Sequence, residues 1–114
     1  MAELKRLSFA VGMLILVVTG QKTGTIRTHK PGINDFIEGE IFIGEFAEGA
    51  DLTLRATANT AAKRFDTITD AEARASSHRD LAQALDSLRE HYPDLTPSHS
   101  MVVIHFEIYP EVYT

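Results

Sequence analysis

The sequence has no cysteine, which excludes disulfide bonds and thiolate chemistry. It also lacks a surplus of positive charge, because its formal net charge is −5. A protein that binds duplex nucleic acid nonspecifically usually carries such a surplus to neutralise phosphates. We therefore expect any contact with nucleic acid to be weak or to use a local pocket.

No hydrophobic run is long enough to cross a membrane as a helix. The most apolar segment, 9–18, is about half of the ~20 residues that a membrane span requires. Residues 19–22 (Thr-Gly-Gln-Lys) would make a poor signal-peptidase cleavage site. We therefore expect a cytoplasmic protein without a membrane partner, and the absence of cysteine suits a reducing compartment.

The length of 114 residues fits a single domain over residues 1–114. A hydrophobic fraction of 44% is ordinary for a globular protein and allows a useful core. The sequence shows no internal repeat, low-complexity stretch or linker that would divide the chain.

The charged residues are unevenly distributed. Lys22, Arg27 and Lys30 lie close together with no acidic residue between them, and an acidic stretch, 38–51, follows. A local excess of positive charge favours an anion even in an acidic protein. The stretch from Lys22 to Lys30 is therefore the first candidate for a binding site.

Segment 8–18 is compatible with either a buried helix or a buried strand, because periodicity cannot separate the two in a fully apolar run. Ser8 is a plausible N-cap and Gly20 a plausible helix stop, which favours a helix. β-Branched residues such as Val11 and Ile15 favour a strand. We predict a helix here.

The rest of the chain predicts an α+β domain, since strands and helices do not alternate in a βαβ rhythm. Strands are expected over 24–28, 40–46, 52–65 (bent near Asn59) and 101–109. Thr69 with Glu72 has capping-box spacing and predicts a short helix. A second helix is expected from Ser77 or His78 to Tyr92-Pro93, with one apolar face: Leu81, Ala84, Leu85 and Leu88.

Segment 20–27 contains the side chains best suited to binding or catalysis. In strand geometry Thr25 and Arg27 share a face, and Lys22 can reach back over the preceding helix end. Arg27 offers a planar fork of donors to a phosphate, carboxylate or base edge. The Thr25 hydroxyl becomes a nucleophile only beside a base. Lys22 can act as that base if burial lowers its pKa. The alternative is a surface turn and an edge strand with a solvated lysine and arginine.

The order of these segments resembles the ASCH family, the activating signal cointegrator 1 homology domains of the PUA-like superfamily. Those domains show an apolar helix running into a Gly-x-Lys-Thr-x-Thr-x-Arg segment, which here is Gly20, Lys22, Thr23, Thr25 and Arg27. The resemblance continues in order through 39–43, 65–73, 81–93 and 102–107. It implies a small mixed PUA-like β-barrel with two or three peripheral helices and a ligand pocket beside the first helix.

The resemblance implies a function in binding. We expect the pocket to bind a modified nucleoside, a nucleotide or a single-stranded RNA element, without a cofactor. The ligand-binding residues implied are Lys22, Thr23, Thr25, Arg27 and Ser76.

The resemblance also implies an alternative of another class, the deacylation of N4-acetylcytidine by small bacterial amidohydrolases of this family. In those enzymes the motif lysine is the base and the second threonine the nucleophile, which correspond to Lys22 and Thr25. A downstream glutamate acts as acid, but this chain has Ser76 or Ser77 near that place. Loss of a general acid costs ~10²–10⁴-fold in rate. Glu72 or His78 is then the candidate to replace it.

Residues outside segment 20–27 suggest three further kinds of site: ribonuclease, metal-binding and base-stacking. A ribonuclease is a weaker alternative, for which the loop 98–100 (Ser-His-Ser) is a candidate. The five histidines are scattered without the helical spacing of a metal pair, so no metal site is expected. Four aromatic rings are candidates for base stacking: Phe36, Phe42, Phe46 and Tyr92.

Overall fold

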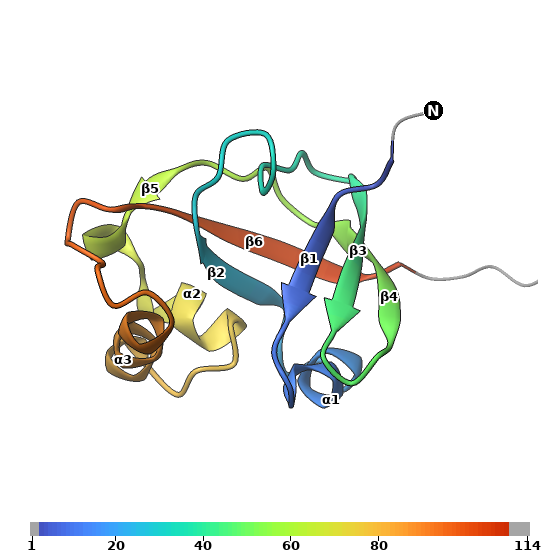
Figure 1. Ribbon diagram of the computed structural model, residues 1–114, viewed down its shortest axis with the longest axis horizontal. Coiled ribbons are helices and arrows are strands. Elements are labelled where there is room, and N and C mark those ends of the chain that lie inside the picture. Colours follow the sequence, from blue (N-terminus) through green and yellow to red (C-terminus); the bar gives the residue numbers. More distant parts are fainter. Residues whose placement is uncertain (1–2, 110–114) are drawn as a thin grey trace, which may run out of the picture.

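A curled six-stranded sheet and three α-helices make up the computed structural model, which describes residues 3–109 (Figure 1). The strands are β1 (Arg6–Phe9), β2 (Gly24–Thr28), β3 (Ile41–Phe46), β4 (Asp51–Ala56), β5 (Lys63–Arg64) and β6 (Ser100–Ile108). The helices are α1 (Met13–Val18), α2 (Asp70–Ala75) and α3 (Leu81–His91), with a 3₁₀ turn at Phe65–Thr67. The α+β class predicted from the sequence is confirmed.

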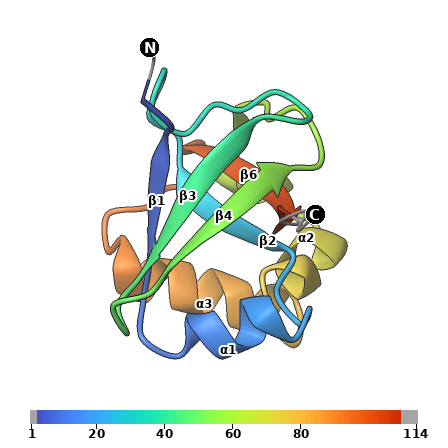
Figure 2. The ribbon, with the colours of Figure 1, turned by 90° about the vertical axis from the view of Figure 1, so that its right-hand side faces the viewer.

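The strand order places β1 and β2 at opposite ends of the sheet. The order is β1-β3-β4-β6-β2, with the short β5 also paired to β6. Only the β1–β3 pairing is parallel among these pairs. The sheet curls into a half-barrel, so that β1 and β2 approach one another (Figure 1). Figure 2 shows that α1 and α3 lie at the same end of these strands.

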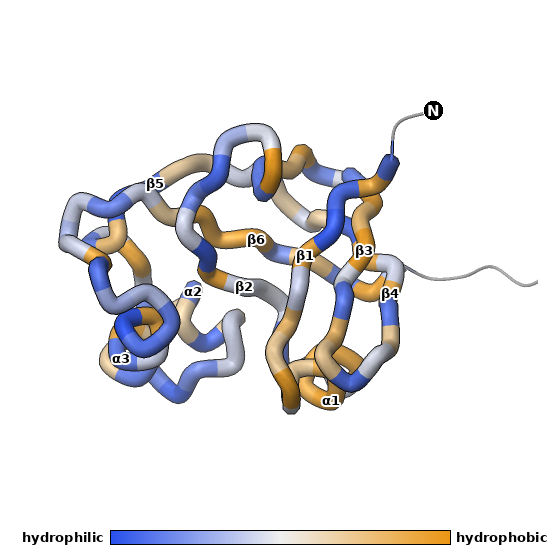
Figure 3. Tube along the Cα trace, viewed as in Figure 1, coloured by the Kyte–Doolittle hydropathy of each residue, from blue (hydrophilic) through white to orange (hydrophobic). Residues whose placement is uncertain are grey.

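Strand β6 buries side chains on both faces and so separates two hydrophobic cores. Figure 3 shows the apolar character of much of its length. The first core fills the curl of the sheet and consists of Leu7, Phe9, Val17, Phe36, Phe42, Phe46, Leu54, Ala56, Val102, Ile104 and Phe106. The second core lies against α3 and consists of Ile26, Phe65, Ile68, Leu88, Met101 and Val103. The alternating side chains of this strand therefore pack into two cores at once.

The apolar segment 8–18 contains both a strand and a helix, so the prediction of one buried helix is wrong. Its first residues end β1, which pairs with the edge of β3. Gly12 then takes a left-handed conformation with φ of 89° and precedes α1, so Ser8 is not the N-cap. The helix is also not a buried one, because Ile15 is 59% accessible, Val18 is exposed and Val17 is its one fully buried residue. Gly20, with φ of 77°, follows the helix as predicted.

The predicted long strand 52–65 is interrupted. Strand β4 ends at Ala56 and β5 is only two residues long. Between them, Asn59 Oδ1 accepts a hydrogen bond from the amide of Glu38, and Thr60 Oγ1 accepts one from the amide of Phe36. Side chains that bind a neighbouring loop in this way compete with a regular strand ladder.

The two later helices follow the predicted pattern except at one boundary. Thr69 and Glu72 form the predicted capping box of α2. Helix α3 begins at Leu81 with Asp80 as N-cap, so the predicted start at Ser77 or His78 is wrong. Ser77 has a φ of 68°, a left-handed conformation that a right-handed helix cannot contain. Among residues 3–109, no helix is both long and apolar enough to span a membrane.

Gly44 on β3 gives a test of the first core. A Cβ atom at this position would lie 2.9 Å from Leu54 Cδ1 and 3.1 Å from a ring atom of Phe46. We expect Gly44→Ala to lower the free energy of unfolding by about 1–3 kcal/mol, because the core has no room for the methyl group. Urea denaturation measures this change.

The neighbouring variant Glu45→Ala is the control. It removes a half-exposed ion pair with Arg6 and should cost about 1 kcal/mol or less. Equal unfolding midpoints for the two variants would contradict the tight packing around Gly44.

Candidate functional site

The pocket that gathers most of the predicted residues has a volume of about 280 Å³. It lies where the end of β1, strand β2, the turn after α2 and the last turns of α3 meet. The predicted location beside the first helix needs correction, because α1 contributes only Met13 to the lining. Helix α3 supplies the opposite wall instead, through Ser87, Leu88 and His91 together with the following Tyr92.

Arg27 closes the gap between the two ends of the sheet. Its Nε donates a hydrogen bond to Thr25 Oγ1 at 3.0 Å, and its Nη2 donates one to the carbonyl of Ser8 at 2.7 Å. The guanidinium also lies 5.1 Å from the centre of the Phe9 ring, within cation–π range. The prediction that Thr25 and Arg27 share a face is confirmed, and Thr25 is buried with only 5% of its surface accessible.

Lys22 is buried, so the alternative of a solvated lysine is wrong. Only 6% of its surface is accessible, and Nζ donates a hydrogen bond to the carbonyl of Ser76 at 3.1 Å. Burial, and then the nearby charge of Arg27, lower the pKa of the Lys22 ammonium to about 8. Because the unfolded chain keeps a higher pKa, the contribution of Lys22 to stability rises with pH between about 8 and about 10.5.

Ser76 and Ser77 form a strained turn that completes the floor of the pocket. The Ser76 hydroxyl is buried and makes no hydrogen bond within residues 3–109. A buried hydroxyl without a partner is rare and unfavourable. The left-handed backbone of Ser77 turns the chain at this point, and both serines line the pocket. A polar ligand atom entering the pocket could therefore pair with Ser76 Oγ.

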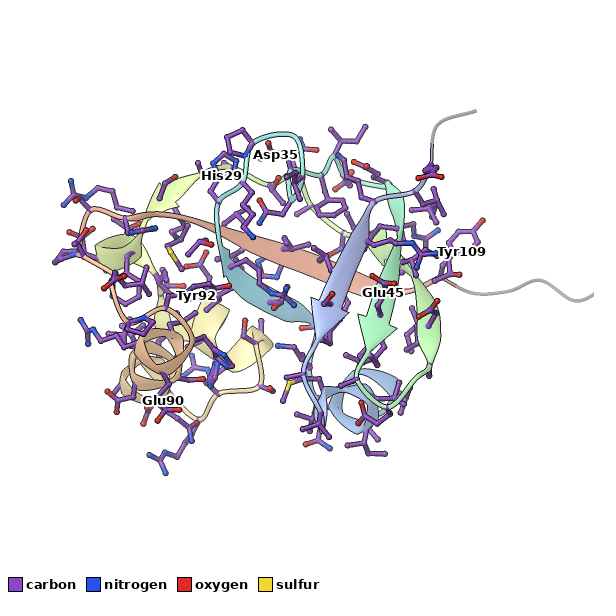
Figure 4. The ribbon with its side chains drawn as sticks, viewed as in Figure 1. His29, Asp35, Glu45, Glu90, Tyr92 and Tyr109 are labelled. Atoms are coloured by element: carbon purple, nitrogen blue, oxygen red, sulfur yellow. The ribbon has the colours of Figure 1, made fainter. Side chains whose placement is uncertain are left out.

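The wall formed by α3 and the turn before it brings aromatic and basic groups to the pocket. Figure 4 shows Tyr92 on the side of α3 that faces β2, whereas Glu90 lies on the far side of the helix. His78 and His91 line the same pocket. Burial lowers the pKa of the His78 imidazole, and the charges of Lys22 and His91 lower it further. No aspartate or glutamate occurs among the described residues that line the pocket.

Two predicted residues lie outside this pocket. Thr23 lines a separate cavity of about 210 Å³ beside the end of α1, and its amide donates a hydrogen bond to the carbonyl of Ala75. Glu72 is held by Lys63, whose Nζ lies 2.7 Å from Oε1, and by the capping box. Burial is the largest single influence on the Glu72 carboxyl and raises its pKa, but the hydrogen bonds from Lys63 and Thr69 and the charge of Lys63 together outweigh it, so the net shift is downward. Because Glu72 is bound to Lys63 and lies outside the pocket, it is not positioned to act as the general acid of a deacylation.

Most of the other candidate residues lie in the core or outside the pocket. Phe36, Phe42 and Phe46 are buried in the first core, so Tyr92 is the one stacking candidate of the four that lines the pocket. His99 lies outside the pocket. In the part of the chain that the structure describes, no group of three histidine or acidic residues could hold a metal ion.

Ser87 and His91 line the pocket without having been predicted as binding residues. Both lie on α3 four positions apart, which places them on one face of the helix. This spacing was available in the sequence. The packing of Leu88 against the second core turns this face of α3 toward β2, and the sequence alone does not show that packing.

The comparisons with known proteins bear on the fold. No protein-family model and no curated protein matches the sequence. A crystal structure of an Enterococcus faecalis V583 protein of the DUF984 family is similar over 100% of this chain and 87% of its own, with a TM-score of 0.65 and 19% identity. An ASCH domain from Lactobacillus crispatus JV V101 is similar over 82% of this chain and 68% of its own, with a TM-score of 0.67 and 14% identity.

These likenesses define the class of the protein by its fold. The resemblance to an ASCH domain that the sequence predicts is confirmed at the level of fold, as is the small α+β barrel with three helices. The chain therefore has the fold of an ASCH domain, with a pocket against β2.

The depressed pKa of Lys22 can be tested directly. We expect the Lys22 side chain to titrate near a pKa of about 8 by NMR of labelled lysine. In Arg27→Gln this pKa should rise, because the loss of a neighbouring positive charge favours the protonated amine. Arg55→Gln, which changes an arginine paired with Glu107, is the control and should leave it unchanged. Titration of Lys22 near the ordinary 10.5 in the parent chain would contradict its burial.

Proposed function

We propose that the pocket binds a modified nucleoside, a nucleotide or an RNA element by enclosing one base. The observation that carries this proposal is the convergence of polar groups on one small cavity: the buried Lys22 ammonium, the half-buried Arg27 guanidinium and the buried Ser76 hydroxyl, which has no partner within residues 3–109. A nucleobase edge offers carbonyl oxygens and ring nitrogens as acceptors for such donors.

The shape and composition of the pocket support a single base rather than a long polyanion. Its volume of about 280 Å³ is just below the ~300–1,000 Å³ typical of small-molecule sites. Tyr92 gives an aromatic surface on which a base can stack. The net charge of −5 opposes the binding of an extended duplex.

Binding can be tested with a panel of nucleosides. We expect at least one of cytidine, uridine, adenosine, guanosine and N4-acetylcytidine to bind with measurable heat by calorimetry. Lys22→Ala should weaken that binding by a factor of about ten or more, because a charged hydrogen bond to the ligand is lost. Lys30→Ala, which changes an exposed lysine outside the pocket, is the matched control. No binding by any member, or equal affinity in Lys22→Ala, would refute the proposal.

A second candidate function is the deacylation of N4-acetylcytidine, favoured by the lowered pKa of Lys22 beside Thr25 in the same pocket. In this reaction Thr25 Oγ1 attacks the acetyl carbon and its proton passes to Lys22 Nζ. The N4–acetyl bond then breaks as the leaving amine takes up that proton from Lys22 Nζ, and water, giving a proton to the neutral Lys22 amine, releases acetate from the threonine.

The lack of a separate general acid for the leaving amine is the weak point of the second candidate. Glu72 is bound to Lys63, and Ser76 carries a hydroxyl that does not ionise in this range. His78 lines the pocket, but its lowered pKa leaves it mostly neutral at pH 7. Ligand binding therefore has stronger support than deacylation as the function of the pocket.

Hydrolysis is tested by incubating the protein with N4-acetylcytidine and following cytidine and acetate by chromatography. If the second candidate is correct, Thr25→Ala should abolish product formation because the nucleophile is lost, whereas Thr23→Ala outside the pocket should retain it. Absence of turnover by the parent protein would leave binding as the function. Turnover that persists in Thr25→Ala would indicate a contaminating hydrolase.

A further inference from the structure

The basic residues of the pocket lack the acidic partners that most lysines and arginines have elsewhere among the described residues. Lys22, Arg27, His78 and His91 line one cavity with no carboxylate among its described lining residues. Elsewhere, six lysines and arginines form ion pairs with acidic side chains that are not consecutive with them in sequence: Lys5, Arg6, Arg55, Lys63, Arg64 and Arg74. Lys30 and Arg89 also form no ion pair among the described residues, but neither lines the pocket, where several basic side chains meet without a carboxylate.

These basic groups also repel one another. The charge of Arg27 disfavours the protonated form of Lys22, and the charges of Lys22 and His91 disfavour the protonated form of His78. An arrangement of like charges without a counter-charge is unfavourable in the free protein. An anion in the pocket would relieve the repulsion, and its binding would be strengthened accordingly.

The groups are arranged by depth. Lys22, Thr25 and Ser76 are buried on the floor, His78 is half-buried, and His91 is exposed at the rim. A phosphate is costly to strip of water, whereas a base is not. The phosphate of a ligand is therefore best held at the rim, where it stays partly hydrated, with the base on the floor.

Building on the proposed base-binding function, we propose that the ligand is a nucleoside monophosphate, free or as the terminal nucleotide of an RNA, whose phosphate is bound by His78 and His91. The base then lies against Tyr92 and receives hydrogen bonds from the floor. The half-exposed Ser87, one turn before His91 on α3, can add a neutral donor to the phosphate.

The experiment compares each nucleoside of the panel with its 5′-monophosphate by calorimetry, together with one RNA trinucleotide with and without a 5′-phosphate. We expect the phosphorylated form to bind more tightly by a factor of about ten at about pH 6. The double variant His78→Gln/His91→Gln should lose this advantage, which is measured as the ratio of the affinities for the phosphorylated and unphosphorylated forms. His99→Gln, a histidine outside the pocket, is the matched control.

The pH dependence adds a readout that a structural role would not give. Histidine binds phosphate more strongly when protonated, so the loss caused by the double variant should be larger at about pH 6 than at about pH 8. The charged groups that face His78 are Lys22 and His91, and both oppose its protonation in the free protein. In His91→Lys, a charge that persists at about pH 8 should preserve the phosphate advantage there.

The outcomes separate this inference from the proposed function. Equal binding of nucleosides and monophosphates would overturn the inference and leave the base-binding pocket standing. A phosphate advantage that survives in the double variant would overturn the role of the two histidines. Binding by no member of either series would refute the proposed function itself. Preference for the phosphorylated trinucleotide over the free monophosphate would support the inference and identify the RNA end as the source.

Discussion

The nine residues of β6 hydrogen-bond to β2, β4 and β5, and their side chains are buried on both faces over Met101–Ile104. This strand therefore joins two hydrophobic cores that would otherwise be separate. The core inside the curl positions β1 and β3, and the core on the other side positions α3. The pocket exists because the two cores bring α3 and the end of β1 to the same strand, β2.

Incomplete closure of the sheet is the second constraint. β1 and β2 end the strand order and approach one another, and a fully closed barrel would join them through backbone hydrogen bonds. Here the side chain of Arg27 spans the gap to the Ser8 carbonyl and the Phe9 ring. An open edge is usually a liability in a β-protein. In this molecule it gives access to a cavity whose floor is a buried lysine.

Burial of Lys22 links the stability of the fold to the chemistry of the site. Removing an ammonium from water is unfavourable, and the single hydrogen bond to the Ser76 carbonyl compensates only in part, as the pKa of about 8 indicates. The strained turn at Ser77 and the unpaired hydroxyl of Ser76 lie next to this lysine. Unfavourable features tend to gather where a protein binds its ligand, because the ligand relieves them.

The sequence by itself determined the strands at 24–28 and 101–109, the capping box of Thr69 and Glu72, and the apolar face of α3, because these depend on periodicity and local hydrogen bonding. It also placed Thr25 and Arg27 on one face. Only the tertiary structure decided that segment 8–18 divides between a strand and a helix, since pairing with β3 outweighs local preference. Tertiary packing alone also brought His78, His91 and Tyr92 opposite Lys22, because residues far apart in sequence meet only when α3 packs on the second core.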